Sequence, residues 1–253
     1  MTGRDEPASF HLHAFKKGTG QEFEATLEIE TERVHSVHLV DHTVVVFGEL
    51  STHDDIITIY DVATQKVTDT MIGDFATLSP DSFHMVFARF YPRFMPPEIV
   101  RSDVAVLYDL RNSPSANRVP GEKPGNPERV GIPIFPIQNA ENRVLDPDSL
   151  NKDHIWGHFV WSDNSTRLGF VARRKNGDVT AVLGTLDTKS RTISVCEKIV
   201  VHQSAGDGTS RNTKVLVKGL SFQGDSMEVL LEGRAPIHVD GLSCDTEYKV
   251  SLK

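Results

Sequence analysis

Histidine is the residue type in this chain with the clearest chemical potential, because imidazole binds metals and transfers protons near neutral pH. The chain has eleven histidines, and the densest group is His35, His38 and His42, with Asp41 beside the last. Residues 34–40 read as a β-strand, in which side chains an odd number of positions apart point to opposite faces. His35 and His38 would therefore diverge, and His42 would lie in the following turn. We expect these histidines to be scattered surface residues rather than metal ligands.

Two further groups of ligand-type residues also fall short of a metal site. His154 and His158 are four positions apart and would share one face of the strand expected there, yet we favour the interpretation without a metal. Asp146, Asp148 and Asp153 resemble a calcium-binding series, but the series lacks a glycine at the bend and a terminal bidentate glutamate. We predict no metal site and no cofactor.

The sequence holds no recognisable catalytic nucleophile. Neither a Gly-x-Ser-x-Gly motif nor a cysteine with a plausible base is present. Ser79, Ser162 and Ser226 lie in polar turns, where hydrogen bonds to the backbone explain them. The glycine-rich stretch 205–210 lacks the lysine and the following helix that a phosphate-binding loop requires. We predict no catalytic residue.

One segment has the composition of an interaction surface. Residues 89–97 (RFYPRFMPP) combine aromatic rings, arginines and a proline-stiffened backbone, which are enriched at protein interaction hot spots. Within it we predict that Arg89, Tyr91, Arg93 and Phe94 bind a protein or peptide partner. The alternative is that Phe90 and Phe94 fill the core beneath the long loop.

Charge and hydropathy exclude several classes of partner. The chain of 253 residues has 27 Lys and Arg against 35 Asp and Glu, a net charge of −8, and nearly all of the excess lies in residues 1–60. Without a basic stripe to neutralise phosphates, nucleic acid and anionic membrane surfaces are not expected partners. No apolar run is long enough to span a membrane and no secretory signal is visible, so the expected location is the cytoplasm. An exported protein whose signal had been removed would look the same.

The two cysteines do not indicate a disulfide framework or a metal site from their number and spacing. Cys196 and Cys244 are too few for a disulfide framework and too far apart for a metal-binding pair motif. A bridge between them is open but is not predicted.

The hydrophobic pattern is that of β-strands. From Phe10 onward, apolar residues mostly alternate with polar ones or form short runs, and they almost never recur at helical spacing. Six strand-like segments fit within the first seventy residues, which leaves no room for crossover helices and excludes a parallel α/β sheet. The six segments are Phe10–Phe15, Phe23–Ile29, Val34–Val40, Thr43–Gly48, Ile56–Tyr60 and Lys66–Thr70.

A repeated unit then selects among the all-β architectures. Three times, an apolar strand end, a tight polar turn and a second apolar strand follow one another, and a shorter fourth copy occurs at residues 39–47. The three full turns are residues 78–82 (LSPDS), 161–165 (WSDNS) and 222–226 (FQGDS). Downstream of three copies a further strand ends at an acidic turn, at Asp61, Asp109 and Asp187. Four antiparallel strands in a unit with a period near 40 residues, as from Phe47 to Phe87, are typical of a β-propeller blade.

The repeat resembles that of TolB-like and WD-repeat-like propellers. The resemblance lies in LSPDS at 78–82, in FVWSDNS at 159–165 and in YDVAT at 60–64. The segment 90–94 is also similar to uncharacterised bacterial propeller-like proteins. The resemblance covers residues 34–252 in pieces and implies the fold more than a function. Propellers of this kind serve as interaction platforms, as accessory domains of peptidases and occasionally as enzymes.

We therefore predict an all-β propeller of four or five blades in a single domain over residues 1–253, with a β-sandwich as the alternative. The expected blades are residues 34–71, 74–119, 157–201 and 215–252. The amino-terminal hairpin could supply the missing outer strand of the fourth blade or form half of a fifth. Residues 111–152, which hold seven of the thirteen prolines, are predicted to be a long loop excursion.

The predicted function is a non-catalytic platform that binds protein or peptide, by analogy with other propellers. One alternative is a hydrolase or lyase with its site at the central channel, where the inner strands converge. Another is the accessory domain of a separate peptidase.

Overall fold

All secondary structure in the described part of the computed structural model is β-strand. The structure describes residues 8–16, 21–29, 31–51, 54–90, 103–112, 130–135, 154–174, 178–202 and 216–252. The strands are β1 (Ala8–Lys16), β2 (Gln21–Ile29), β3 (Arg33–Val40), β4 (Thr43–Ser51), β5 (Asp54–Asp61), β6 (Lys66–Ile72), β7 (Asp74–Leu78), β8 (His84–Phe90), β9 (Asp103–Asp109), β10 (Ile132–Phe135), β11 (His154–Trp161), β12 (Arg167–Arg173), β13 (Val179–Asp187), β14 (Thr192–Val201), β15 (Val217–Gln223), β16 (Ser226–Leu231), β17 (Ile237–Val239) and β18 (Thr246–Ser251). None of these residues forms a helix that could cross a membrane.

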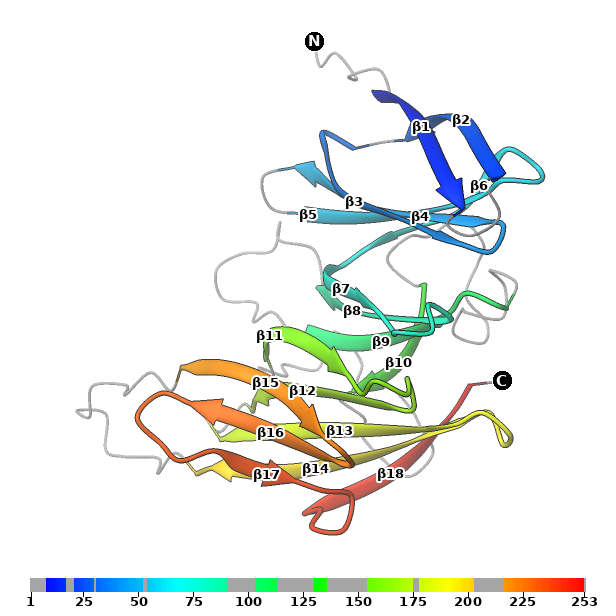
Figure 1. Ribbon diagram of the computed structural model, residues 1–253. Helices are drawn as coiled ribbons and strands as arrows, with labels where there is room; N and C mark the ends of the chain where they lie inside the picture. Colours follow the sequence, from blue (N-terminus) through cyan, green and yellow to red (C-terminus); the bar gives the residue numbers. More distant parts are fainter. Residues whose placement is uncertain are drawn as a thin grey trace. The chain divides into compact units, whose positions relative to one another are not determined.

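The chain divides into two compact units. Residues 1–74 and 122–130 form the first, and residues 75–121 and 131–253 form the second. In the first unit β1 pairs with β2 as a hairpin, and β3 to β6 form an antiparallel sheet in chain order (Figure 1). Leu27 and Ile29 of β2 share a buried cluster with Val44 and Val46 of β4. The hairpin therefore packs on the sheet through its apolar residues.

In the part of the second unit that the structure describes, the strands form three antiparallel sheets, each built almost entirely from consecutive strands (Figure 1). Strands β7 to β10 form a four-stranded sheet, and β15 to β17 form a three-stranded one. Strands β11 to β14 form the third sheet, to which β18 adds a fifth strand beside β14. Meanders of this size are what a propeller uses as blades.

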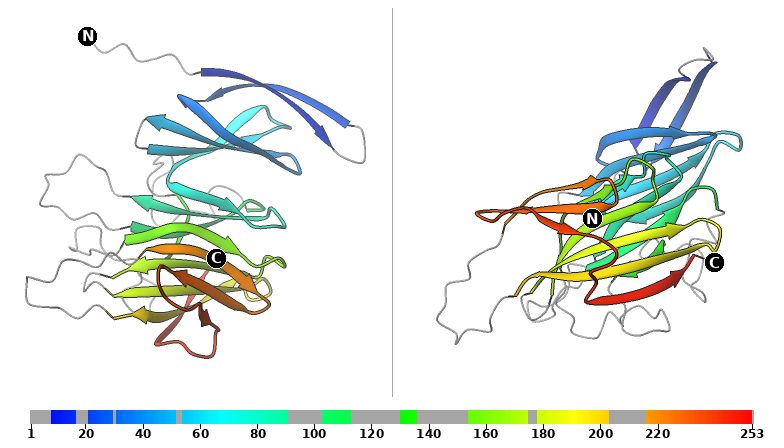
Figure 2. Two further views of the ribbon diagram at one scale, coloured as in Figure 1. Left: turned by 60° about the vertical axis from the view of Figure 1, so that its left-hand side comes forward. Right: turned by 60° about the horizontal axis from the view of Figure 1, so that its bottom comes forward.

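The five-stranded sheet is covered on both faces by the other two sheets of its unit (Figure 2). Along β12, Leu168 and Phe170 belong to a core shared with β8 to β10, whereas Val171 belongs to a core shared with β15 to β17. Side chains alternate between the faces of a strand, and both faces are apolar here because both are covered. Since three meander sheets pack in series, a sandwich of two sheets does not describe this unit. The all-β, propeller-like fold is confirmed.

A glycine lets two of these sheets approach closely. A Cβ atom at Gly169 of β12 would collide with the sulfur of Met227 of β16, whose side chain is fully buried. The five-stranded and three-stranded sheets are thus in contact at a point where only hydrogen fits.

Two of the three repeated turns, at residues 78–82 and 161–165, have the same hydrogen-bond pattern. The hydroxyl of Ser79 accepts the backbone N–H of His84 at 3.0 Å, and that of Ser162 accepts the N–H of Arg167 at 2.9 Å. Each serine also donates to the carboxylate or amide side chain two residues later. These bonds hold the turn in place, which confirms that turn hydrogen bonding explains Ser79 and Ser162. For Ser226 this explanation stays a prediction.

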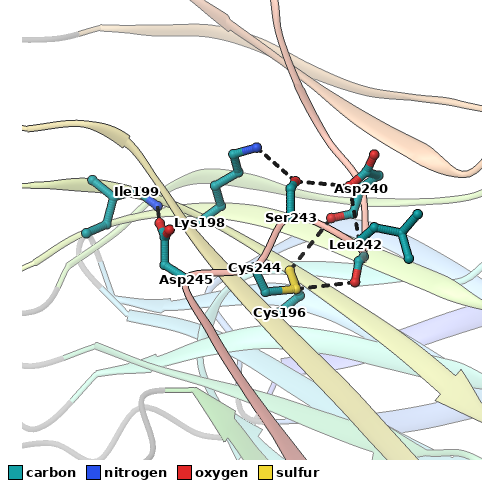
Figure 3. The surroundings of a disulfide bond; sticks show 9 residues. Cys196, Lys198, Ile199, Asp240, Leu242, Ser243, Cys244 and Asp245 are labelled. Carbon is teal, nitrogen blue, oxygen red and sulfur yellow. Dashed lines mark hydrogen bonds between the residues drawn. A yellow bond between two sulfur atoms is a disulfide. The ribbon is translucent and has the colours of Figure 1, made fainter.

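The two cysteines form a disulfide that the sequence left open. Cys196 of β14 and Cys244, in the connection between β17 and β18, are 48 positions apart, and their Cα atoms lie 5.3 Å from each other. Figure 3 shows Lys198 beside the bridge, and its Nζ donates to the hydroxyl of Ser243 at 2.8 Å. Bridge and hydrogen bond together fix the chain where it leaves the three-stranded sheet and returns to the five-stranded one.

The predicted fourth blade, residues 215–252, is wrong in its second half. Strands β15 to β17 form their own sheet, but β18 pairs with β14 of the preceding one. The reason is burial, because Val250 and Leu252 enter the core between the four-stranded and five-stranded sheets. The hairpin does not complete the fourth blade either, since β1 and β2 pair only with each other among the described residues.

Part of the predicted loop excursion is strand. Within residues 111–152, Ile132–Phe135 form β10, which pairs with β9 and completes the four-stranded sheet. Ile134 and Phe135 are buried there, which explains why this apolar stretch forms a strand within the predicted loop. Most of the remaining excursion lies outside the described residues, and a single domain over the whole chain stays a prediction.

Candidate functional site

A pocket of about 220 Å³ lies at one end of the two larger sheets of the second unit. The start of β8, the end of β9, the turn between β13 and β14 and the residue after β18 contribute to its wall. In Figure 1 the β13–β14 turn and the carboxyl end of β18 lie on the same side of the sheet, as the pairing of Thr192 with Ser251 requires. Its polar lining includes His84, Asp109, Arg111, Asn112, Asp187 and Arg191.

Arg111 and Asp109 form the central ion pair of the pocket. The Nε of Arg111 donates to Oδ1 of Asp109 at 3.0 Å, and its Nη2 donates to Oδ2 at 3.1 Å. The backbone N–H of Arg111 donates to Oδ1 as well, at 3.0 Å. Burial raises the pKa of Asp109, but the hydrogen bonds from Arg111 outweigh it, and the pKa lies below its usual value. The guanidinium also lies over the ring of Phe83, 5.0 Å from its centroid.

His84 is a buried, neutral imidazole in this wall. Its side chain is 3% exposed, and its Nε2 lies 3.0 Å from Nη2 of Arg111. A guanidinium can only donate, so Nε2 accepts and the ring proton sits on Nδ1. Burial lowers the pKa of His84, the charge of Asp109 opposes that shift, and the charge of Arg111 adds to it. His84 is therefore held in its uncharged form.

Two buried nitrogen atoms of residues that line the pocket have no acceptor among the described residues. These atoms are Nδ1 of His84 and Nδ2 of Asn112. Asp187, by contrast, already accepts the backbone N–H groups of Lys189 and Ser190 and the hydroxyl of Ser190. These bonds hold the pKa of Asp187 below its usual value, those from Ser190 most strongly. The pocket can therefore receive a group that accepts hydrogen bonds.

The arrangement is poorly suited to proton transfer. A general base needs a free lone pair aimed at its substrate. Nε2 of His84 accepts from Arg111, and both oxygens of Asp109 accept from it too, which makes this carboxylate a weaker base. The side chains of His84, Asp109 and Arg111 thus position one another.

Of the four predicted binding residues, the structure describes one. Arg89 lies in β8 and is 2% exposed, so its guanidinium is part of the interior of the second unit. Tyr91, Arg93 and Phe94 lie outside the described residues. Their role in partner binding stays a prediction.

The histidine cluster of β3 has the geometry that its spacing predicts. His35 is exposed and lies 3.7 Å from the carboxylate of Asp55, while His38 is half-buried and shares a hydrogen bond with Ser36. Burial lowers the pKa of His38. His158 is exposed, with its ring edge-on to that of Phe75. The described ranges contain no group of three residues able to hold a metal ion.

The sequence predicts Asp109 and Asp187 to be turn residues but does not indicate the pocket. The available signal was a departure from pattern. Asp61 is followed three positions later by Thr64, which donates to it, and Asp187 is followed likewise by Ser190. After Asp109 the donor is instead Arg111, a long charged side chain that a turn does not need.

Comparison with known proteins gives remote structural similarity and no family. No protein-family model and no curated protein matches the chain. A structure from a study of two prolyl endopeptidases is 12% identical, with a TM-score of 0.40 over 89% of this chain and 36% of that one. The β-propeller domain of the Trilobed protease from Pyrococcus furiosus is 13% identical, with a TM-score of 0.33 over 81% of this chain and 56% of that one.

TolB from Acinetobacter baumannii is 12% identical, with a TM-score of 0.33 over 89% of this chain and 48% of that one. The chain thus spans between 36% and 56% of the length of these three proteins.

Proposed function

We propose that this chain is a non-catalytic platform that binds protein or peptide. The observation that carries the proposal is the pocket around Arg111, in which a charged group is fixed in place and two buried donors lack partners among the described residues. Fixed arginines with aromatic support are a common feature of interaction hot spots. A binding site needs such a preorganised group, because little conformational entropy is then lost on association.

The same geometry argues against a hydrolase at this pocket. Asp109 and His84 are the residues that would serve as base, but Nε2 of His84 accepts from Arg111, and hydrogen bonds from Arg111 lower the pKa of Asp109 and make it a weaker base. Arg111 cannot act as the base itself, because a guanidinium stays protonated in proteins.

We further propose that the protein works in an oxidising compartment, in place of the cytoplasm expected from the sequence. The support is the bridge between Cys196 and Cys244. Disulfides persist in secreted, periplasmic and surface proteins and are rare where thiols are kept reduced. Alkylation of free thiols in intact cells of the source organism, followed by mass measurement, tests the redox state. Two alkylated cysteines would contradict the proposal.

The binding proposal is tested by panning the full chain against a displayed library of random linear peptides. We expect enriched peptides that bind saturably and that keep their intact mass after prolonged incubation with the protein. Cleaved or otherwise altered peptides would instead indicate an enzyme. A library that yields no saturable binder would contradict the platform.

A further inference from the structure

The guanidinium of Arg111 has two N–H groups to spare. A guanidinium carries five, one on Nε and two on each terminal nitrogen. The carboxylate of Asp109 accepts the N–H of Nε and one N–H of Nη2. Nε2 of His84 accepts the other N–H of Nη2. The two on Nη1 have no partner in the part of the chain that the structure describes. Asp109 and the ring of Phe83 hold this donor pair in one place.

Two buried donors complete the set. The amide nitrogen of Asn112 and the Nδ1–H of His84 are shielded from solvent and unpartnered among the described residues, and both residues line the pocket. A buried donor without a partner is destabilising, and few are tolerated in a folded protein. Both residues line the pocket, so an acceptor group bound there would lie beside them.

Charge and size restrict what that acceptor can be. The lining has two arginines, Arg111 and Arg191, and two aspartates, Asp109 and Asp187, so its formal charge balances. This balance disfavours a doubly charged phosphate, whereas one negative charge can be met by the spare face of Arg111. A pocket of about 220 Å³ has room for one small group rather than for a whole cofactor.

We propose that this pocket binds the carboxylate group of a peptide partner, either an acidic side chain or a free carboxyl end. The inference rests on the proposed function and names the chemistry recognised at its pocket. Nη1 of Arg111 supplies the charged donors, and Asn112 supplies a neutral one. Arg191, which makes one weak bond to the carbonyl of Leu252 at 3.4 Å, borders the same opening.

The test uses N-acetylglycine as a minimal carboxylate and N-acetylglycinamide as its uncharged counterpart. Proton–nitrogen NMR spectra of the full chain are recorded during titration with each. We expect saturable shifts of the Arg111 Nε–H and of the backbone amides of residues 186–191 with the carboxylate only. Inorganic phosphate should shift them at much higher concentration. Equal shifts with carboxylate and amide, or tighter binding of phosphate, would overturn the inference.

Variants separate binding at the pocket from binding elsewhere. Arg111→Gln removes the charge, and Asn112→Asp adds a repelling one without touching the pair of Arg111 with Asp109. Each variant should raise the dissociation constant of N-acetylglycine by about tenfold or more, since hydrogen bonds to a charged group are stronger than neutral ones. Arg234→Gln, at an exposed arginine outside the pocket lining, is the matched control and should bind like the parent. Unchanged affinity in Asn112→Asp, with a well-dispersed spectrum, would overturn the inference even if Arg111→Gln unfolds.

Failure of the inference and failure of the platform give different results. If selected peptides bind the parent and Arg111→Gln equally well, the proposal of a peptide-binding platform is supported and the proposal of a carboxylate-binding pocket is contradicted. If N-acetylglycine binds but no peptide does, the pocket is a small-molecule site and the platform falls.

Discussion

The guanidinium of Arg111 donates two hydrogen bonds, of 3.0 and 3.1 Å, to the two carboxylate oxygens of Asp109 at the end of a strand. Elsewhere in the chain, the equivalent strand-end aspartates Asp61 and Asp187 are held by a threonine or a serine. A short hydroxyl is enough to close such a turn. The arginine adds a fixed positive charge to the wall of a pocket.

Asp109→Asn should both destabilise the protein and loosen Arg111. The asparagine keeps the shape but leaves a guanidinium that is less than half exposed without its counter-charge. Because Arg111 still reaches water, we expect a loss of only about 1–2 kcal/mol in the free energy of unfolding. Urea titration measures it. A variant as stable as the parent would show that the pair contributes nothing to the fold.

The free energy of unfolding should fall as the pH drops below about 6.5, the usual pKa of histidine. The pKa of His84 is lowered in the folded state by burial, so between these two values the unfolded chain binds a proton that the folded chain does not. Stability is therefore full above the unfolded pKa and is lost toward the folded one, by at most about 1.4 kcal/mol per pH unit for one histidine. Urea titrations between pH 8 and pH 5 test this.

Variants of two histidines show how much each contributes to the pH dependence of the free energy of unfolding. His38 has a pKa lowered by burial too, so it acts in the same direction. We expect His84→Gln and His38→Gln each to flatten the dependence, and the double variant to flatten it most. A slope that survives in the double variant would contradict the assignment. The lowered pKa values of Asp61, Asp109, Asp187 and Asp240 act below the range measured, near and under the ordinary carboxyl pKa.

Replacing both cysteines by alanine should lower the free energy of unfolding by about 4 kcal/mol, the chain-entropy value for a loop of this length. The bridge closes a segment of 48 positions that includes the whole three-stranded sheet. Thermal and urea unfolding of Cys196→Ala/Cys244→Ala measure the loss. Reduction of the parent should reproduce it. A loss below about 1 kcal/mol would mean that the sheet is held without the bridge.

Gly169→Ala should destabilise the protein by about 1–3 kcal/mol, because the new methyl group overlaps the buried sulfur of Met227. Gly219→Ala is the matched control within a strand, since a Cβ there meets nothing within 4 Å. It should be neutral or slightly stabilising. A smaller residue at 227, as in Gly169→Ala/Met227→Val, should restore part of the loss. Equal stability of the two alanine variants would contradict the close approach of the sheets.

Local pattern predicts local structure well in this chain. The turn serines Ser79 and Ser162 were identified from six or seven residues of sequence, and their hydrogen bonds lie within those residues. Alternating hydrophobicity likewise indicated most strands. The all-β class and the meander sheets follow from signals of this range, because every sheet strand except β18 pairs with neighbours in the chain.

What the sequence did not predict depends on contacts between distant residues. The bridge of Cys196 with Cys244 exists because β18 returns to the edge of β14, and no local pattern records that return. The pocket combines the end of β9 with a turn some eighty residues later. Arg111 was read as the first residue of a loop, since its partners are visible only once the sheets are assembled.

The dissociation constant of one selected peptide for the parent and for Arg111→Gln tests the central claim most directly. We expect Arg111→Gln to raise the dissociation constant of the peptide by about tenfold or more, because a charge-assisted hydrogen bond at the binding site is lost. Arg234→Gln should leave the dissociation constant unchanged. Fluorescence anisotropy with the labelled peptide gives all three values, and urea titration confirms that each variant is folded. Equal affinity of the parent and a folded Arg111→Gln would contradict the claim that this pocket is where the chain binds its partner.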